Sequence, residues 1–275
     1  MTDQYAVMGN PIAHSKSPSI HKQFAEQTGQ SLAYTAILVE KNAFPQAVDT
    51  FQSQGGKGLN ITVPFKEEAW HCVNERSKRA ELAGAINTIV FQEDGSRFGD
   101  NTDGVGLIND IVKNNHGQIA GNHILVVGAG GATRGIVGPL LDEKPAQLVI
   151  ANRTAEKAIM LAEDFLPLGN VRGCGLDLPN NQKFDMVINA TAASLQGEIP
   201  ALPENIFAAD GWCYDLMYSA EPTAFMQWSQ QQGASVMLDG LGMLVEQAAE
   251  SFYLWRGVRP ETGPVLSSLR DALHH

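Results

Sequence analysis

Four apolar residues, Ile124 to Val127, lead directly into a glycine-rich segment that begins at Gly128. An apolar run of this kind predicts a strand buried in a parallel sheet, and the glycines predict a tight turn from that strand into a helix. Such a turn leaves backbone N–H groups at the helix N-terminus for a pyrophosphate. Thr133 occupies the third glycine position of the usual G-x-G-x-x-G pattern, and no Gly-Lys-Ser/Thr follows. A P-loop is therefore disfavoured, while a dinucleotide site and a plain strand-to-helix turn both stay open.

The residues after the next predicted strand, 147–151, indicate which dinucleotide would bind. An NAD site usually places Asp or Glu here, on the ribose 2′-hydroxyl. This chain has Asn152, Arg153 and Thr154 instead. Because a guanidinium can hold a 2′-phosphate through two parallel hydrogen bonds, the segment favours NADP. The alternative is that Arg153 is a solvated surface charge and that Thr154 only caps a helix over 155–165.

Composition sets the class of protein. A chain of 275 residues with 44% hydrophobic and 18% charged residues is ordinary for a globular enzyme of one large or two modest domains. No apolar run is long enough for a membrane span, and the N-terminus does not resemble a secretion signal. Three scattered cysteines predict no disulfide framework and no metal site, so a cytoplasmic location is expected. The net charge of −11 disfavours nucleic acid and anionic membranes as partners.

Apolar strands that alternate with helical segments predict an α/β chain, with an antiparallel hairpin at Asp94-Gly95. In the first part of the chain, Ser17 is expected to cap a helix that ends at Gly29. Strands are expected at 5–8, 33–39, 58–63, 86–91, 97–99, 124–127, 147–151, 184–189, 212–216 and 236–238. Further helices are expected at 42–53, 66–83, 104–113, 155–165 and 242–256.

Polar side chains stand at the ends of several of these strands, where α/β sheets present their ligands. Each has an ordinary structural explanation by itself: Ser17 as a cap, Lys66 as a surface lysine, Asp103 as a cap for the helix that follows. Together they offer hydroxyls, amides, one cation and one carboxylate, which suits a small, hydroxylated, anionic molecule. The set comprises Ser15, Ser17, Asn60, Thr62, Lys66, Asn87, Asn101, Thr102 and Asp103.

Seven short segments carry a resemblance to a known family across nearly the whole chain. Through them the chain resembles the shikimate dehydrogenases, NADP-dependent enzymes of chorismate and aromatic amino-acid biosynthesis. The segments are GNPIAHSKSP (9–18), NITVPFK (60–66), AGAINT (83–88), GDNTDG (99–104), GAGGA (128–132), NRT (152–154) and DGLGMLVEQAA (239–249).

The resemblance implies two α/β domains around a cleft. Residues 1–103, completed by C-terminal helices within 240–275, would form a substrate-binding and catalytic domain with a mixed sheet. Residues 104–239 would form a Rossmann-like NADP-binding domain. The implied reaction is the reversible reduction of 3-dehydroshikimate to shikimate by NADPH, with the small-molecule substrate as partner and a monomer or homodimer as the assembly.

The resemblance also assigns residues. Lys66 and Asp103 match the catalytic pair, and which of the two carries the proton stays open. The usual Asn-Ala-Thr-Ser reads Asn-Ala-Thr-Ala here, so Ala192 lacks a hydroxyl near the cofactor. The substrate-binding positions are Ser15, Ser17, Thr62, Asn87, Asp103, Tyr218 and Gln247. The cofactor-binding positions are Gly128, Ala129, Gly130, Gly131, Ala132, Asn152, Arg153, Thr154, Ala155, Glu156, Lys157, Leu216 and Gly240.

Three alternatives are weighed against this interpretation. A quinate/shikimate dehydrogenase of the same family could use NAD, which Arg153 disfavours. A non-catalytic ligand-sensing relative would be expected to lose Lys66 or Asp103, and both are present. A methyltransferase could also use a glycine-rich turn, but it would need an acidic ribose partner near residue 152.

Overall fold

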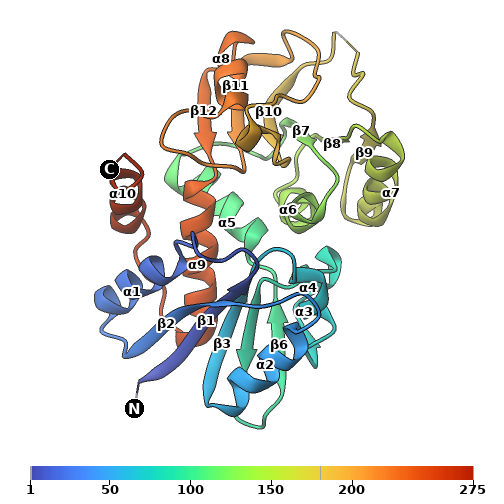
Figure 1. Ribbon diagram of the computed structural model, residues 1–275. Coiled ribbons are helices and arrows are strands. Elements are labelled where there is room, and N and C mark those ends of the chain that lie inside the picture. Colours follow the sequence, from blue (N-terminus) through green and yellow to red (C-terminus); the bar gives the residue numbers. More distant parts are fainter. Residues whose placement is uncertain (1, 180, 275) are drawn as a thin grey trace. The chain divides into compact units, whose positions relative to one another are not determined.

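The computed structural model describes residues 2–179 and 181–274, which fall into two compact units (Figure 1). Unit 1 comprises the chain up to Gly106 together with Val245–Ser268. Unit 2 comprises Leu107–Leu244 and the chain from Leu269 onward. Each unit contains a six-stranded sheet of its own.

Unit 1 contains a mixed sheet in the order β2-β1-β3-β5-β6-β4. Strands β1, β2 and β3 run parallel, whereas β5 is antiparallel to β3 and β6, which confirms the predicted hairpin. The strands are β1 (Asp3–Gly9), β2 (Leu32–Leu38), β3 (Gly56–Ile61), β4 (Glu75–Arg76), β5 (Thr88–Phe91) and β6 (Arg97–Asp100). The helices are α1 (Ser17–Thr28), α2 (Phe44–Ser53), α3 (Lys66–Trp70) and α4 (Lys78–Ala83).

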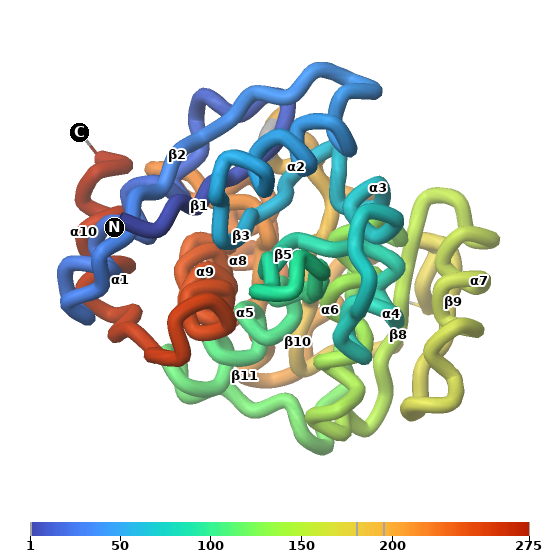
Figure 2. The backbone as a smooth tube through the Cα atoms, turned by 90° about the horizontal axis from the view of Figure 1, so that it is seen from below, coloured from blue at the N-terminus to red at the C-terminus, as the bar shows by residue number. Residues whose placement is uncertain are grey.

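The alternation of side chains along β3 gives the two faces of this sheet different partners. Leu59 and Ile61 join a buried cluster with Phe44 and Val48 of α2. Asn60 points to the other face, where it donates a hydrogen bond to Ser251 of helix α9 (Leu241–Arg256). Figure 2 shows α9 running beside β3 and β5. Helix α9 therefore brings polar side chains to the same region as the strand ends.

Two local predictions in unit 1 are wrong. The segment 66–83 is not one helix: α3 ends at Trp70, β4 pairs with β6, and α4 begins only after Ser77. The side chain of Ser77 accepts a hydrogen bond from the N–H of Ala80, which is the cap that starts the second helix. Ser17 is the first residue of α1 rather than its cap, because Lys16 holds the N-cap position without a side-chain bond.

Unit 2 contains an all-parallel sheet in the order β12-β11-β10-β7-β8-β9. The order reverses at β7, where chains of this topology bind their ligands. The strands are β7 (His123–Val127), β8 (Gln147–Ala151), β9 (Val171–Cys174), β10 (Phe184–Asn189), β11 (Phe207–Asp215) and β12 (Val236–Asp239). The helices are α6 (Gly131–Asp142), α7 (Ala155–Phe165) and α8 (Ala224–Gln231), with α5 (Asp103–Asn109), α9 and α10 (Gly263–Asp271) crossing the unit boundaries.

The predicted α/β class, with one mixed and one parallel sheet, is confirmed. Strands β8 and β10 and helix α7 begin and end where the sequence predicts. Strand β9 and helix α8 were not predicted, and β11 begins five residues earlier than expected. Helix α10 lies within the C-terminal segment 240–275 where helices were expected, but its bounds were not predicted. Within the described ranges, no helix combines the length and apolar character that crossing a membrane requires.

Candidate active site

Lys66 and Asp103 form a close ion pair in unit 1. Lys66 is the first residue of α3, Asp103 is the first residue of α5, and the Lys66 Nζ lies 2.6 Å from Asp103 Oδ2. The lysine side chain is 30% exposed and the aspartate side chain 11% exposed. The pair is therefore held against the protein while the ammonium keeps contact with solvent. This geometry places a proton donor and an acceptor beside one another at an accessible position.

Asn87 holds the second oxygen of Asp103. Its side-chain N–H₂ donates to Asp103 Oδ1 over 2.8 Å and to Thr102 Oγ1 over 2.9 Å. The same group donates to the side-chain oxygen Oε1 of Gln247 on α9 over 3.3 Å. Because Asn87 is 2% exposed, its amide cannot turn away to water. Four residues that the sequence assigned to the site, Lys66, Asn87, Asp103 and Gln247, are thus joined through direct contacts.

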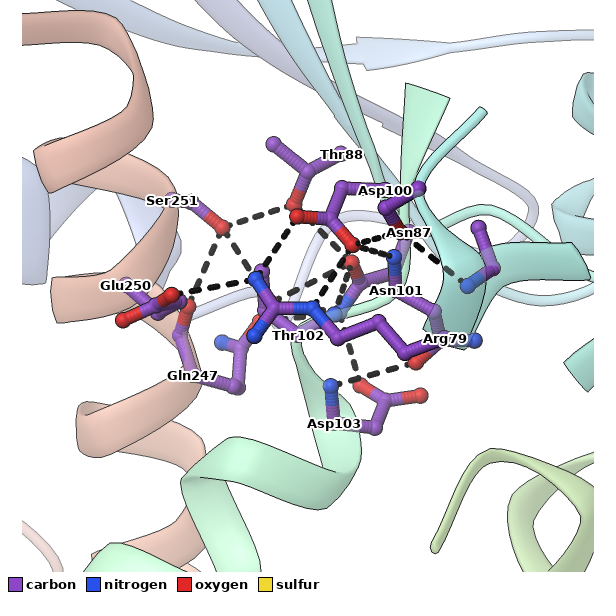
Figure 3. Close-up of polar contacts among 12 residues, drawn as sticks. Arg79, Asn87, Thr88, Asp100, Asn101, Thr102, Asp103, Gln247, Glu250 and Ser251 are labelled. Carbon is purple, nitrogen blue, oxygen red and sulfur yellow. Dashed lines mark hydrogen bonds and ion pairs between the residues drawn. The ribbon is translucent and has the colours of Figure 1, made fainter. Parts of the chain in front are cut away.

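The hydroxyl groups of Thr88 and Ser251 form a hydrogen-bonded group next to Asn87 (Figure 3). The Thr88 hydroxyl donates to Asn87 Oδ1 over 2.9 Å, and it lies 2.7 Å from the hydroxyl of Ser251. Ser251 follows Gln247 by one helical turn on α9, so the two residues share a face. Asn60 donates to both hydroxyls from β3. All four are buried, so these hydrogen bonds restrict the rotamer of Asn87.

Ser15, Ser17 and Thr62 lie just beyond the carboxyl ends of β1 and β3, which are adjacent parallel strands. The N–H of Ser17 donates to Ser15 Oγ over 3.3 Å. Thr62 shares a tight turn with the following residues, because its carbonyl accepts from the N–H of Phe65. Among the residues that the structure describes, no hydrogen bond joins these three side chains to Lys66 or Asp103.

The glycine-rich turn in unit 2 has the form that the sequence predicts. Gly128 has a φ of 110°, which side chains rarely adopt, and its N–H donates to the carbonyl of Ala151 on the neighbouring strand. Thr133, in the third glycine position, is fully buried, and its hydroxyl donates to the carbonyl of Gly128 over 2.9 Å. The departure from the usual glycine pattern therefore closes the turn with a side-chain hydrogen bond.

The start of α6 fits a pyrophosphate. A Cβ added at Gly130 or Gly131 would meet no protein atom within 4 Å, so packing inside the chain does not require glycine there. The N-terminus of α6 has no side-chain cap, which leaves its N–H groups for an anion. Ala129 and Ala132 complete the segment with small side chains. These features leave room and donors for a dinucleotide.

The segment after β8 presents its cations outward. Arg153 and Lys157 are exposed, and neither forms an ion pair with any residue in the described ranges. Thr154 occupies the N-cap position of α7, but its hydroxyl makes no capping bond. The side chain of Asn152 donates to the carbonyl of Thr154 over 2.9 Å and fixes the turn. Ala155 and Glu156 form the first turn of α7.

A buried carboxylate organises the ends of β10 and β11. Asp215 is fully buried and accepts hydrogen bonds from the Thr223 hydroxyl at 2.6 Å, the Asn189 amide at 3.0 Å and the N–H of Met217 at 3.1 Å. Burial raises the pKa of Asp215, although these hydrogen bonds oppose the shift. The same amide of Asn189 also donates to the Ser194 hydroxyl, two residues past Ala192. The loop that lacks the expected hydroxyl is therefore still tied to Asn189.

The remaining predicted positions follow this carboxylate. Leu216 comes next in the chain and is 9% exposed. A Cβ at Gly240 would collide with the backbone of Leu216, so glycine is required for the two segments to approach. Tyr218 is partly buried, and burial raises the pKa of its phenol. These three positions belong to unit 2.

Several residues of the site could not be chosen from the sequence. Thr88, Ser251, Asp100 and Arg79 all reach the loop that carries Asp103 or its partner Asn87. Thr88 and Asp100 lie within the segments 83–88 and 99–104 that carry the family resemblance, and Ser251 lies four residues after Gln247 on an amphipathic helix. Arg79 left no such signal. The contacts of Arg79 depend on folding of segments far apart in the chain.

A six-stranded parallel sheet that carries a glycine-rich turn after β7 and cations after β8 defines a dinucleotide-binding α/β protein. Three family models narrow this class. Residues 7–89 match the shikimate dehydrogenase substrate binding domain, residues 110–196 match shikimate / quinate 5-dehydrogenase, and residues 240–270 match the shikimate 5'-dehydrogenase C-terminal domain. The chain belongs to the shikimate dehydrogenase family.

Known relatives cover its full length. A protein named shikimate dehydrogenase (NADP(+)) from Cellvibrio japonicus is 60% identical over 100% of this chain and 99% of its own. The crystal structure of an Ael1 enzyme from Pseudomonas putida has a TM-score of 0.92 and 43% identity, covering 98% of both chains. The structure of shikimate 5-dehydrogenase from Thermus thermophilus in complex with NADP(H) and shikimate has a TM-score of 0.87 and 30% identity, covering 99% of this chain and 100% of that one.

Proposed function

We propose that this chain catalyses the reversible reduction of 3-dehydroshikimate to shikimate with NADPH. The observation that carries the proposal is the 2.6 Å pair of Lys66 and Asp103, with Asn87 holding the other aspartate oxygen. Its support comes from relatives that share the whole chain and are named shikimate dehydrogenase (NADP(+)).

Unit 1 is proposed to bind the substrate. Ser15 and Ser17 would hold the carboxylate with their hydroxyl groups, beside the N-terminus of α1. The amides of Asn87 and Gln247 and the carboxylate of Asp103 would bind ring hydroxyls, because each offers a polar atom in one connected group. Thr62 and, from unit 2, Tyr218 are proposed as further hydroxyl contacts.

Unit 2 is proposed to bind NADP. The N–H groups at the start of α6 would receive the pyrophosphate, and Arg153 with Lys157 would receive the 2′-phosphate. The hydroxyl of Thr154, which is not used as a cap, adds a third donor to that group. Leu216 and Gly240 would adjoin the nicotinamide. When bound, the cofactor supplies the hydride that reduces the carbonyl carbon.

The proton step belongs to residues of unit 1. As the carbonyl oxygen gains negative charge, the Lys66 ammonium donates a proton to it, and the neutral amine takes the proton back in the reverse direction. Asp103 holds Lys66 through Oδ2 and accepts a hydrogen bond from the substrate hydroxyl. Because Asn87 fixes Oδ1, the carboxylate keeps one orientation throughout. Proton transfer through Asp103 itself is the competing assignment.

Spectrophotometric oxidation of NADPH on addition of 3-dehydroshikimate tests this function. We expect turnover with NADPH, much weaker turnover with NADH, and little with 3-dehydroquinate. If the chain is instead a quinate/shikimate dehydrogenase, the rates with 3-dehydroshikimate and 3-dehydroquinate should be comparable. Binding of shikimate without any turnover would contradict an enzymatic function and favour a ligand sensor.

A further inference from the structure

The turn between β6 and α5, which ends at Asp103, takes its shape from side chains. Three successive backbone N–H groups in this turn each donate to a side-chain oxygen. That of Asn101 donates to Asp100 Oδ1 over 2.7 Å, that of Thr102 to Asn87 Oδ1 over 2.9 Å, and that of Asp103 to Asn101 Oδ1 over 3.2 Å. The direction of Asp103 therefore depends on how these three side chains are held.

Asn101 and Asn87 are held by hydrogen bonds to backbone carbonyl groups. The side-chain N–H₂ of Asn101 donates to the carbonyl of Ala85 over 3.1 Å. The backbone N–H of Asn87 donates to the carbonyl of Asp100 over 3.0 Å. Asp100 differs from them, because it is a charged group that is only 2% exposed. A buried carboxylate must be paired and hydrogen-bonded to stay in place.

Arg79 supplies that pairing from α4. Its Nε and one terminal nitrogen lie 2.7 Å and 2.6 Å from the two oxygens of Asp100, which is the parallel two-bond geometry that fixes a carboxylate plane. The same nitrogen reaches Glu250 of α9 over 3.0 Å. Burial lowers the pKa of Arg79, but the two carboxylates outweigh it and raise the pKa overall, so the guanidinium stays charged.

Arg79 and Asp100 lie beside the proposed catalytic group without taking part in it (Figure 3). Within the described residues, the Arg79 side chain donates hydrogen bonds to Asp100 and Glu250 and to no other residue. The connection to Asp103 passes through the Asp100 carboxylate and the backbone of the turn. The hydroxyl of Ser77, the cap of α4, also donates to Asp100, so the start of that helix is joined to the same point.

We propose that Arg79 and Asp100 are positioning residues for the proposed catalytic Asp103. The guanidinium orients the Asp100 carboxylate, the carboxylate holds the N–H of Asn101, and the turn then directs Asp103 toward Lys66. This inference rests on the proposed function of the Lys66–Asp103 pair. It implies that the pair also needs, at residue 79, a planar cation that can form two parallel hydrogen bonds to Asp100.

The substitution Arg79→Lys tests the proposal, because lysine keeps the positive charge but cannot form the parallel pair of bonds. We expect kcat to fall about 10- to 100-fold, the scale of a small misplacement of a catalytic group, with an unchanged KM for NADP. Arg259→Lys is the matched control, since Arg259 also contacts Glu250 but, among the described residues, forms no hydrogen bond with Asp100. It should leave kcat unchanged.

A double-mutant cycle separates positioning from a general structural effect. In an Asp103→Asn background, Arg79→Lys should cause little further loss of kcat if it acts through Asp103. An equal fold-loss in both backgrounds would overturn the proposal, as would a wild-type kcat in Arg79→Lys. If Arg79→Lys does not fold, Asp100→Asn takes its place in the same cycle. A normal kcat in Asp103→Asn alone would instead refute the proposed role of the pair.

Discussion

Lys66 and Asp103 contact each other directly, so their contributions to catalysis should depend on one another. We expect Lys66→Ala to lower kcat about 10²–10⁴-fold with little change in KM, because a positioned acid or base acts mainly in the transition state. Asp103→Ala should lower kcat and also raise the KM for shikimate. The double variant should be hardly worse than Lys66→Ala. If the fold-losses in kcat of the two single variants multiply in the double variant, the two residues act independently. A near-normal kcat in Lys66→Ala would assign the proton transfer to Asp103 or to a bound water instead.

Arg153 is exposed and forms no ion pair with a described residue, so its removal should not disturb the fold. Arg153→Ala should weaken NADPH binding by about 1.5–3 kcal/mol, the scale of a lost charge-assisted hydrogen bond. The affinity for NADH, measured by the same titration, is the internal control and should hardly change. Equal losses for the two cofactors would contradict the assignment of the 2′-phosphate site.

His21 is a histidine whose side chain is fully buried. Its ring stacks on Tyr34 at 4.3 Å and lies 5.2 Å from the Trp255 ring. Burial lowers the pKa of His21 from 6.5 to about 3. Between these values the unfolded chain binds a proton that the folded chain does not, so the stability of the fold must fall as the pH drops from about 6.5 toward 3.

His21→Phe should therefore flatten the pH dependence of the unfolding free energy. The slope of this free energy against pH reports how many more protons the unfolded chain binds than the folded chain. Between about pH 4.5 and 6 we expect that number to decrease by up to one in the variant. Gln54→Ala, which replaces an exposed residue without an ionisable group, is the control and should leave the slope unchanged. Denaturant unfolding at several pH values measures it. An unchanged slope in His21→Phe would mean that this histidine is not the source of acid sensitivity.

At the scale of elements, the position of α9 depends on a glycine in β3. A Cβ at Gly58 would collide with the indole of Trp255, and it would lie 2.8 Å from the carbonyl of Ile89. That same carbonyl accepts the indole N–H of Trp255 over 3.0 Å. Helix α9 also carries Gln247 and Ser251. The close approach of Trp255 to Gly58 therefore helps to position these two side chains next to Asn87 and Thr88.

Gly58→Ala should lower the unfolding free energy by about 1–3 kcal/mol through overpacking. Gly263→Ala is the matched control, because a Cβ at that position would meet no atom within 4 Å and the residue has no positive φ. It should leave stability nearly unchanged. Urea unfolding of the two variants measures the difference, and equal midpoints would show that α9 adjusts to the added methyl group.

Elements with a strong local pattern were predicted well, and those fixed by distant contacts were not. Strand β8 contains the apolar run 148–151, and α7 has a clear amphipathic stripe. The segment 66–83 has good helix formers at both ends, but β4 pairs with β6 and interrupts it. The motif residues Lys66 and Asp103 were found from the sequence. The hydrogen bonds of Arg79 and Ser251 around them were not predicted, because no local pattern specifies which distant side chains meet.

At the scale of the whole molecule, each of the two units has a buried core of its own. Unit 1 contains the connected polar group around Asp103, and unit 2 contains the glycine-rich turn and the exposed cations. A reaction that needs both a bound substrate and a bound dinucleotide would use residues of both units. We therefore expect the complete chain to move a hydride from NADPH to 3-dehydroshikimate.

The most direct test of that claim follows the transferred atom. The complete chain would be incubated with 3-dehydroshikimate and NADPH carrying deuterium at C4, with each C4 face labelled in turn, and the product analysed by mass spectrometry and NMR. We predict that one of the two labelled cofactors gives shikimate with one deuterium, on the carbon that bears the new hydroxyl, for each NADPH oxidised. Oxidation of NADPH without labelled shikimate, or no oxidation at all, would contradict the proposed function.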